Sequence, residues 1–260
     1  MDERRDDQRP ILLITAGGPY PAILANALKD AFPDVRIIEE APESKAAFLK
    51  RRARLIGWVQ TIGQFFTMTL SRFGKRFARR RETEIFAMPG VRARLDPSVP
   101  VIRVSSVNAP DCLDAIAAAS PGVVLLASCR LMRASTLEKI PCPVLNFHPG
   151  ITPQYRGMWG GYWARAMGDA DNYGATVHLV DPGVDTGAVI RQARFAPHPR
   201  ETIFTDALAQ AAGSREIVVA SVADALAGRL TPLAVSGVSR QYFHPTIWSY
   251  LWRGIIRGAW

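Results

Sequence analysis

Two polar loop motifs, each following an extended apolar run, constrain this chain more than any other feature. They are LNFHPGITPQYRG, residues 145–157, and VDPGVDTG, residues 180–187. Asn146 and His148 are two residues apart where an apolar run ends, so on a strand their side chains point the same way. Proline and glycine then predict a loop, and Asp185 lies in the second glycine-bearing turn. The motifs predict a polar centre suited to acyl-group chemistry; the alternative is a capped strand end with a hydrogen-bonded histidine.

Short apolar runs alternate with segments of helical spacing along the rest of the chain. The run 122–127 is continuously apolar, which is typical of a central parallel strand. The opening, from residue 11 to residue 38, has the β-α-β pattern of a Rossmann fold. Further strands are predicted at 101–104, 144–148, 174–180 and 188–195, and helices at 111–119, 162–167 and 203–226. We therefore predict an α/β fold with a Rossmann-like, mostly parallel central sheet.

A glycine pair follows the first predicted strand. Backbone N–H groups at Gly17 and Gly18 would be free to approach a phosphate at the start of the next helix. The pair does not match the GxGxxG pattern, and no acidic residue clearly takes the ribose position. Substrate binding at this turn and an ordinary turn both stay open.

The positive charge of the chain is concentrated in one insertion, residues 43–88. The net charge is +9, and residues 45–81 hold eleven Lys or Arg and no acidic residue. Residues 55–70 between the basic parts carry no charge, and they are too short and too polar to predict a transmembrane helix. A basic-flanked apolar helix suits an anionic membrane surface. It equally suits docking on the protein core, whereas nucleic-acid binding is disfavoured because aromatic and basic residues do not interleave.

Composition sets the remaining bounds. The three cysteines, Cys112, Cys129 and Cys142, lack CxxC spacing and predict reduced, buried thiols of a cytoplasmic protein. The four histidines show no metal-ligand spacing, and the N-terminus does not resemble a signal peptide. We expect a catalytic domain at 10–195 that contains the insertion, followed at 196–260 by a helix and an aromatic tail packed on it. The tail is also a candidate homodimer surface.

The two loop motifs together resemble those of the folate-dependent formyltransferases. The shared residues are Asn146, His148 and Pro149, then Pro153 and Tyr155-Arg156-Gly157, and finally Asp181, Gly183 and Asp185-Thr186-Gly187. That family includes glycinamide ribonucleotide, methionyl-tRNA and nucleotide-sugar N-formyltransferases. The resemblance is close over 101–195, weak over 10–40 and absent over 43–88.

The resemblance implies an enzyme that uses 10-formyltetrahydrofolate as formyl donor and needs no metal. It implies Asn146, His148 and Asp185 as the catalytic residues. It also implies that two loops hold the pterin, largely through backbone groups: Arg130, Leu131 and Met132 in one, and Pro182, Gly183 and Val184 in the other. Weaker candidates for substrate binding are Gly17, Gly18, Thr152, Tyr155 and Arg156.

Departures from the family pattern bear on the acceptor. Residues 150–152 read Gly-Ile-Thr where the family usually has Ser-Leu-Leu, which predicts a reshaped acceptor pocket. The turn at 17–18 lacks the family's phosphate loop for glycinamide ribonucleotide, and the chain is shorter than methionyl-tRNA formyltransferases with their C-terminal domain. The favoured acceptor is therefore the amine of a sugar, either nucleotide-linked or lipid-linked, and the favoured location is the cytoplasm or the inner face of the membrane. The alternatives are a shortened methionyl-tRNA formyltransferase, a formyltetrahydrofolate hydrolase and a non-catalytic binding module.

The chemistry of these side chains agrees with the resemblance. Formyl transfer passes through a tetrahedral oxyanion, to which the Asn146 amide can donate. His148 can accept the proton of the attacking amine or stabilise the oxyanion. Asp185 would fix the tautomer of the histidine and favour its charged form.

Overall fold

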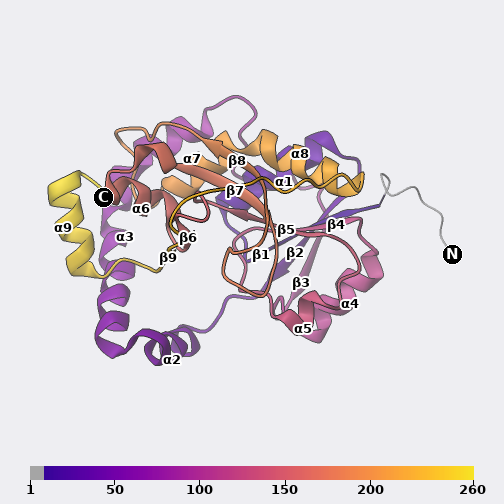
Figure 1. The fold of residues 1–260 in the computed structure, drawn as a ribbon, viewed down its shortest axis with the longest axis horizontal. Coiled ribbons are helices and arrows are strands. Elements are labelled where there is room, and N and C mark those ends of the chain that lie inside the picture. Colours follow the sequence, from indigo (N-terminus) through magenta and orange to yellow (C-terminus); the bar gives the residue numbers. More distant parts are fainter. Residues whose placement is uncertain (1–8) are drawn as a thin grey trace.

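The fold is a seven-stranded sheet covered by helices on both faces, as seen in a computed structural model that describes residues 9–260 (Figure 1). For residues 45–48, 51, 55 and 70–73 it describes the backbone alone. The strand order is β3-β2-β1-β4-β5-β7-β8, in which β1 to β5 are parallel and β7 and β8 are antiparallel. The strands are β1 (Ile11–Thr15), β2 (Val35–Glu40), β3 (Val101–Val104), β4 (Val123–Leu126), β5 (Val144–His148), β7 (Gly174–Leu179) and β8 (Val189–Arg194). The predicted mostly parallel α/β sheet is confirmed.

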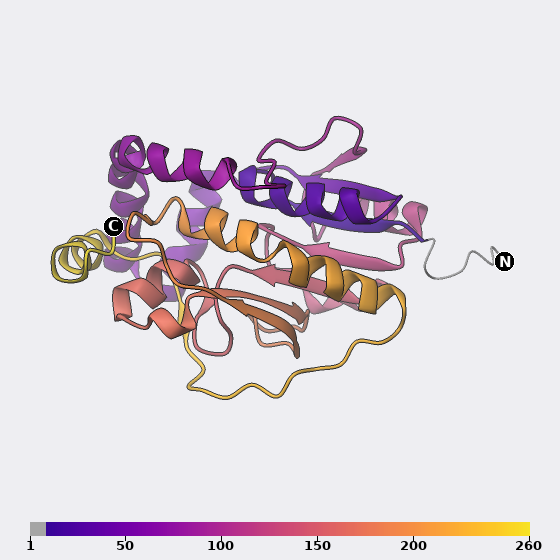
Figure 2. The same cartoon turned by 90° about the horizontal axis from the view of Figure 1, so that it is seen from above.

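Apolar side chains on both faces of the sheet form two core layers. In β1, Ile11 and Leu13 face one layer while Leu12 and Ile14 face the other, which explains why the whole strand is apolar. The first layer is covered by α1 (Pro19–Ala31), α7 (Asp206–Gly213) and α8 (Arg215–Leu226), and α1 and α8 lie on the same side in Figure 2. The second is covered by α4 (Pro110–Ala119) and α5 (Ala134–Leu137).

The insertion forms two helices at one end of the sheet, α2 (Lys45–Ile56) and α3 (Trp58–Phe86). They separate at Gly57, which has a φ of 82° that an L-residue rarely adopts. Helix α3 runs without a break from the uncharged residues into the basic ones, so the charge pattern did not mark a structural boundary. No helix in the part of the chain that the structure describes is long and apolar enough to cross a membrane.

The C-terminal segment returns to the same end of the molecule. After α8 an extended segment, residues 228–240, passes β8, where Leu233 N donates to Val189 O (Figure 2). It reaches β9 (Gln241–Tyr242), which pairs with β6 (Arg156–Gly157), and ends in α9 (Ile247–Arg257). Helix α9 packs against α3 and against α6 (Gly160–Met167), which is followed by the 3-10 turn η2 (Ala170–Asn172). Most of the large apolar side chains of this aromatic tail are exposed, so only its inner side packs on the protein.

Two further predictions need correction. The expected single helix at 203–226 is two helices, because Gly213 packs against the ring of Phe195 and the chain turns at Ser214. Of the three cysteines, which are all free, Cys112 is buried whereas Cys129 and Cys142 are partly exposed.

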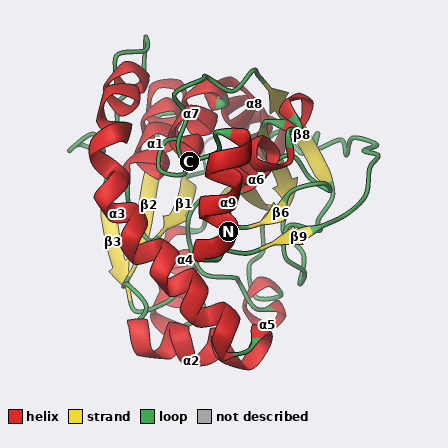
Figure 3. Ribbon diagram, turned by 90° about the vertical axis from the view of Figure 1, so that its left-hand side faces the viewer, coloured by secondary structure: helices red, strands yellow, loops and turns green. Residues whose placement is uncertain are grey.

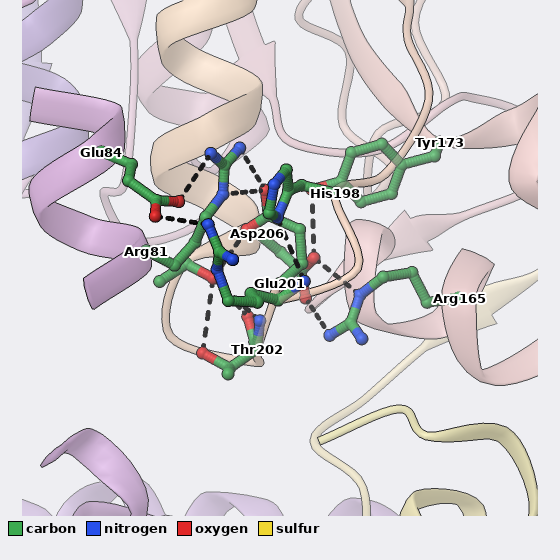
Figure 4. Close-up of polar contacts among 10 residues, drawn as sticks. Arg81, Glu84, Arg165, Tyr173, His198, Glu201, Thr202 and Asp206 are labelled. Carbon is green, nitrogen blue, oxygen red and sulfur yellow. Dashed lines mark hydrogen bonds and ion pairs between the residues drawn. The ribbon is translucent and has the colours of Figure 1, made fainter. Parts of the chain in front are cut away.

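Buried polar contacts fix the C-terminal end of α3 and the neighbouring helices to one another (Figure 4). Arg81 Nε donates to Glu201 Oε1 at 2.8 Å, and the Glu201 side chain is almost fully buried. Arg165 donates to both carboxylate oxygens of Asp206, at 2.9 and 2.8 Å, and Tyr173 donates to the same carboxylate at 3.1 Å. Burial opposes the charge of Arg165, but the attraction of Asp206 outweighs it and raises the pKa of Arg165.

We expect Arg165→Ala to lower the free energy of unfolding by about 3–5 kcal/mol, because it leaves the Asp206 carboxylate buried without a counter-charge. Arg36→Ala is the matched control: it breaks a half-exposed pair with Asp34, which we expect to cost about 0–1 kcal/mol. Chemical denaturation of both variants measures the difference. Equal losses in the two variants would contradict a structural role for the buried pair.

Candidate active site

The candidate site is built on two adjacent strands, β5 and β7. Asn146 and His148 lie at the carboxyl end of β5, with their side chains on the same side as predicted. Strand β7 runs antiparallel to β5 in a register that sets His178 opposite Asn146. The pairing brings a second histidine to the centre, where His178 Nε2 lies 3.0 Å from Asn146 Nδ2.

Asp185 joins this centre from the loop after β7. Its backbone has a φ of 50°, in the left-handed region that non-glycine residues seldom occupy. Its Oδ1 accepts from Asn146 Nδ2 at 3.1 Å, and its Oδ2 accepts from the backbone N–H of Gly157 at 2.8 Å. His148 Nδ1 lies 3.4 Å from Oδ2. The structure therefore brings Asn146 and His148, two of the predicted catalytic residues, to opposite oxygens of the third, Asp185.

The environment of Asp185 favours the ionised carboxylate. Burial of the group opposes ionisation. The attraction of His148, the contact with His178 and the hydrogen bond from Gly157 N–H outweigh burial, and together they hold the pKa of Asp185 well below its usual range. The site consequently keeps a negative charge beside two imidazole rings.

Each nitrogen of the buried His148 ring faces an oxygen. Its Nε2 lies 2.6 Å from the carbonyl oxygen of Tyr155, which can only accept, so Nε2 carries a hydrogen. That bond leaves Nδ1, the nitrogen nearest Asp185, as the position where a proton can be taken up. A proton there would lie between the ring and the carboxylate.

The second histidine fixes the orientation of the amide. His178 Nδ1 lies 2.7 Å from the carbonyl oxygen of Leu179, so in the neutral ring Nδ1 carries the hydrogen and Nε2 accepts from Asn146; in the charged ring Nε2 also carries a hydrogen and faces Asp185. Both N–H bonds of Asn146 are then engaged, one by His178 and one by Asp185. Donation to an incoming oxygen therefore requires one of these hydrogens to change partner.

Gly150 is in contact with the imidazole ring. A Cβ at this position would lie 2.6 Å from His148 Nε2 and 2.7 Å from Tyr155 O. The hydrogen bond that orients His148 therefore depends on the missing side chain. The close contact explains why residue 150 of this chain is glycine, whereas the formyltransferases that the sequence resembles usually have serine there.

The weaker substrate candidates divide into three groups. Thr152 and Tyr155 are buried; Thr152 O accepts from Gln192 and the Tyr155 hydroxyl donates to Asp169. Their side chains face the protein interior, and substrate binding by them stays a prediction. Arg156 donates to Val184 O at 2.7 Å and so ties the Asp185 loop to β6.

Gly17 and Gly18 border a separate cavity of about 200 Å³. The carboxylate of Glu39, at the end of β2, lies on its wall beside Gly17. A negative wall disfavours phosphate and favours sugar hydroxyl groups, which can donate to it. The cavity thus offers the acidic residue near the ribose position that sequence reasoning did not find.

Sequence reasoning also missed His178 and Tyr20. His178 gave only the alternation of its strand as a signal, and its place beside Asn146 follows from an antiparallel register that no local pattern encodes. Tyr20 lies at the start of α1 with its ring 6.1 Å from that of Phe147, and burial raises the pKa of its phenol.

Comparison with known proteins identifies the family. The family model described as formyl transferase matches residues 74–216, more than half of the chain. The chain belongs to the formyl transferase family. The match covers the catalytic candidates and begins inside α3, so most of the insertion lies outside it.

Similar proteins agree with this assignment. Methionyl-tRNA formyltransferase of Desulfotalea psychrophila is 33% identical over 111 residues, which are 42% of this chain and 34% of that protein. The match thus spans only about a third of the length of that relative. A sugar N-formyltransferase from Shewanella sp FDAARGOS_354 has a similar fold, with a TM-score of 0.57, 13% identity, and coverage of 90% of this chain and 76% of that one. WlaRD, a sugar 3N-formyl transferase solved in the presence of dTDP and 5-N-formyl-THF, has a TM-score of 0.52, 12% identity and coverage of 90% and 69%.

The two predicted folate loops begin at opposite ends of the strands. The first follows the carboxyl end of β4, whereas the second follows the antiparallel strand β7, where Val180 N donates to Val144 O at the start of β5. Met132 is buried in the core layer against which Val180 packs, so both loops border the same layer. Arg130 donates to the carboxylate of Glu40 and to Ala41 O, which fixes the first loop. Leu131 is exposed and offers an apolar contact for a flat ring.

The second predicted folate loop is held in a similar way. Gly183 N donates to Asp181 at 3.1 Å, while Val184 O accepts from Arg156 and Pro182 stays exposed. Fixed backbone with exposed apolar edges fits a pterin. Within residues 9–260 no group of three or more His, Cys, Asp and Glu side chains is arranged to hold a metal ion.

The lowered pKa of Asp185 predicts a dependence of stability on pH. A carboxylate with a depressed folded-state pKa stabilises the fold above its unfolded pKa of about 4, and this contribution is lost as the pH falls toward the folded value. We compare the free energy of unfolding of the wild type with that of Asp185→Asn. As the pH falls from about 5 to about 2, we expect the value for the wild type minus the value for the variant to decrease. Denaturation curves across this range measure the difference, and an increase on acidification would contradict the depressed pKa.

Proposed function

We propose that this protein is an N-formyltransferase that moves the formyl group of 10-formyltetrahydrofolate to the amine of a sugar. The observation that carries the proposal is the convergence of Asn146, His148 and Asp185, in which Asp185 accepts a hydrogen bond from Asn146 and lies 3.4 Å from His148. Residues 10–195 supply these groups and the proposed folate loops. Residues 196–260 support them from outside through β9 and α9.

The residues have separate roles in the proposed reaction. The folate supplies the formyl group when it is bound. One N–H of Asn146 leaves its resting partner and donates to the formyl oxygen, where negative charge develops. His148 takes the proton of the attacking amine at Nδ1, since Nε2 remains bonded to Tyr155 O. It would return this proton to the folate nitrogen as the bond between that nitrogen and the formyl carbon breaks, so that tetrahydrofolate leaves. Asp185 then stabilises the protonated ring through the 3.4 Å contact.

A nucleotide-linked amino sugar is the proposed acceptor. Two sugar N-formyltransferases share the fold over 90% of this chain, and one of them was solved in the presence of dTDP. The cavity beside Gly17 and Gly18 supports a sugar or ribose more than a phosphate, because Glu39 lies on its wall. The same carboxylate argues against glycinamide ribonucleotide, whose phosphate would meet a negative wall there.

A lipid-linked amino sugar is the second candidate acceptor. The insertion reaches the catalytic loop, because Arg52 Nη2 of α2 donates to Met158 Sδ at 3.5 Å. Met158 follows Gly157, whose N–H holds Asp185. A chain carried along α2 and α3 would therefore arrive beside the catalytic carboxylate.

The acceptor is tested by incubating the purified protein with 10-formyltetrahydrofolate and a panel of amino sugars on nucleotide or lipid carriers. We expect release of tetrahydrofolate together with one added formyl group on one acceptor, read by mass spectrometry. Formate release without an acceptor would instead show a hydrolase, and folate binding without any turnover a binding module. Formylation of methionyl-tRNA, with binding that weakens steeply as salt rises, would show a tRNA enzyme.

We expect the catalytic residues to differ in what they control. Asn146→Ala should lower kcat by about 10²–10³-fold, since it removes an oxyanion donor. His148→Ala should lower kcat by about 10²–10⁴-fold and remove the dependence on the protonation of the base. Steady-state rates across pH measure both effects. Asp114→Asn is the control, because Asp114 is exposed on α4. Full activity in the two site variants would disprove the assignment.

We expect Gly150→Ala to lower kcat by about 10²-fold, because the added methyl group would displace the His148 ring from its bond to Tyr155 O. Gly74→Ala is the matched control, since a Cβ at Gly74 in α3 meets no atom within 4 Å. It should keep the wild-type rate and gain about 0.5–1 kcal/mol of stability. Kinetics and denaturation of both variants test this, and a Gly150→Ala enzyme of normal rate would contradict it.

A further inference from the structure

Helix α9 has its apolar side turned away from the protein. Large apolar side chains repeat along its outer side and are all exposed: Trp248, Leu251, Trp252, Ile255 and Ile256. Two of them are among the most exposed apolar residues described, Trp252 at 65% and Ile255 at 72%. The inner side holds Tyr250, which packs against Tyr162, together with polar and small groups: Arg253 donates to Ala166 O and Gly254 is buried. A surface helix normally has the opposite arrangement.

The first half of α3 shows the same inversion. Its outward residues are apolar, and they are Trp58, Val59, Ile62, Phe65 and Phe66. Its inward residues are polar, and Thr61, Gln64 and Thr67 are buried. Gln64 accepts from Arg52 of α2 at 3.0 Å, and the threonine hydroxyls donate to carbonyl oxygens one turn earlier, so the buried polar atoms are satisfied.

The two helices pack against each other and present one surface. Gly63 of α3 lies against the indole of Trp248, where any Cβ would overlap the ring. Figure 3 looks onto this end of the molecule and shows α9 beside α3. We call this surface the apolar face; it comprises the exposed apolar side chains of α9 and of the first half of α3 named above, with Trp260.

The apolar face is formed by two segments whose own charges are all positive. Residues 45–81 and 225–260 contain no acidic residue. On α3, Arg76 and Arg80 are exposed and follow Ile62 by 14 and 18 residues, four and five helical turns, so they continue the same side of the helix. Lys50 and Arg54 of α2 are exposed nearby in the chain. The face therefore ends in positive charge.

We propose that the apolar face docks on an anionic phospholipid bilayer, with α9 and the first half of α3 lying in the interface. Amphipathic helices that lie in this region combine tryptophan and large aliphatic residues with a basic border. The exposed tryptophans and the absence of acidic residues favour lipid over a protein partner, because most protein surfaces carry both signs of charge. Arg76 and Arg80 would contact lipid phosphates.

Vesicle sedimentation tests the proposal with the purified full chain. The vesicles contain phosphatidylcholine alone or phosphatidylcholine mixed with phosphatidylglycerol, at low and raised salt. Trp252→Glu/Ile255→Glu removes two exposed apolar contacts, and Leu233→Glu/Val235→Glu makes the same charge change at exposed sites in the 228–240 segment. Arg76→Glu/Arg80→Glu reverses two charges beside the face, with Arg103→Glu/Lys139→Glu on β3 and after α5 as its control. The assay needs neither formyl donor nor acceptor, so its result is independent of the proposed activity.

We expect the wild type to bind the anionic vesicles, and to bind them less well as salt rises. Trp252→Glu/Ile255→Glu should weaken binding about a hundredfold, since two large side chains no longer enter the interface. Arg76→Glu/Arg80→Glu should weaken it about tenfold or more. Both control variants should bind like the wild type after allowance for their equal change in net charge, and all four should unfold at the wild-type temperature.

Three outcomes would overturn the proposal. The first is wild-type protein that remains in solution with both kinds of vesicle. The second is equal binding of Trp252→Glu/Ile255→Glu and Leu233→Glu/Val235→Glu, or equal binding of the wild type to neutral and anionic vesicles. The third is a wild-type dimer in light scattering that Trp252→Glu/Ile255→Glu converts to monomer, which would assign the face to self-association.

Discussion

The candidate active site depends on the contacts of one group, the carboxylate of Asp185. It accepts from Asn146 on β5 and from Gly157 N–H at β6, and it faces His148 and His178. A buried carboxylate without such partners would be too costly to keep ionised. The geometry of three chain segments and the charge of one group are therefore coupled, and the strained backbone of Asp185 is held by these bonds.

The local sequence pattern was enough to predict the sheet and the convergence of Asn146, His148 and Asp185. Asn146 and His148 were readable because a strand alternates its side chains and proline with glycine ends it. His178 was not readable, because its place depends on which strand pairs with β5 and in which register. The inward turn of the Tyr155 side chain likewise depends on a residue 14 positions away, because its hydroxyl bonds to Asp169. Sequence spacing predicts which residues share a side, whereas long-range packing decides what that side meets.

The insertion also shows that sequence periodicity does not determine which side of a helix packs on the protein. Its composition predicted basic and apolar helical segments, and α2 and α3 confirm them. The usual rule would then place Phe65 and Phe66 inside and Thr67 outside. The structure has the reverse, because Gln64 bonds to Arg52 and Gly63 admits the indole of Trp248. A periodic pattern gives two sides to a helix without saying which one faces the protein.

Helix α3 joins the two regions as a stiff rod. Its 29 residues span about 44 Å, and its far end is held to the catalytic domain by the bond between Arg81 and Glu201. If a bilayer contacts the apolar face, α3 and α9 determine its distance from the carboxylate of Asp185. Such an enzyme would select its acceptors by reach as well as by shape, since only an amine that projects over that distance could arrive at His148.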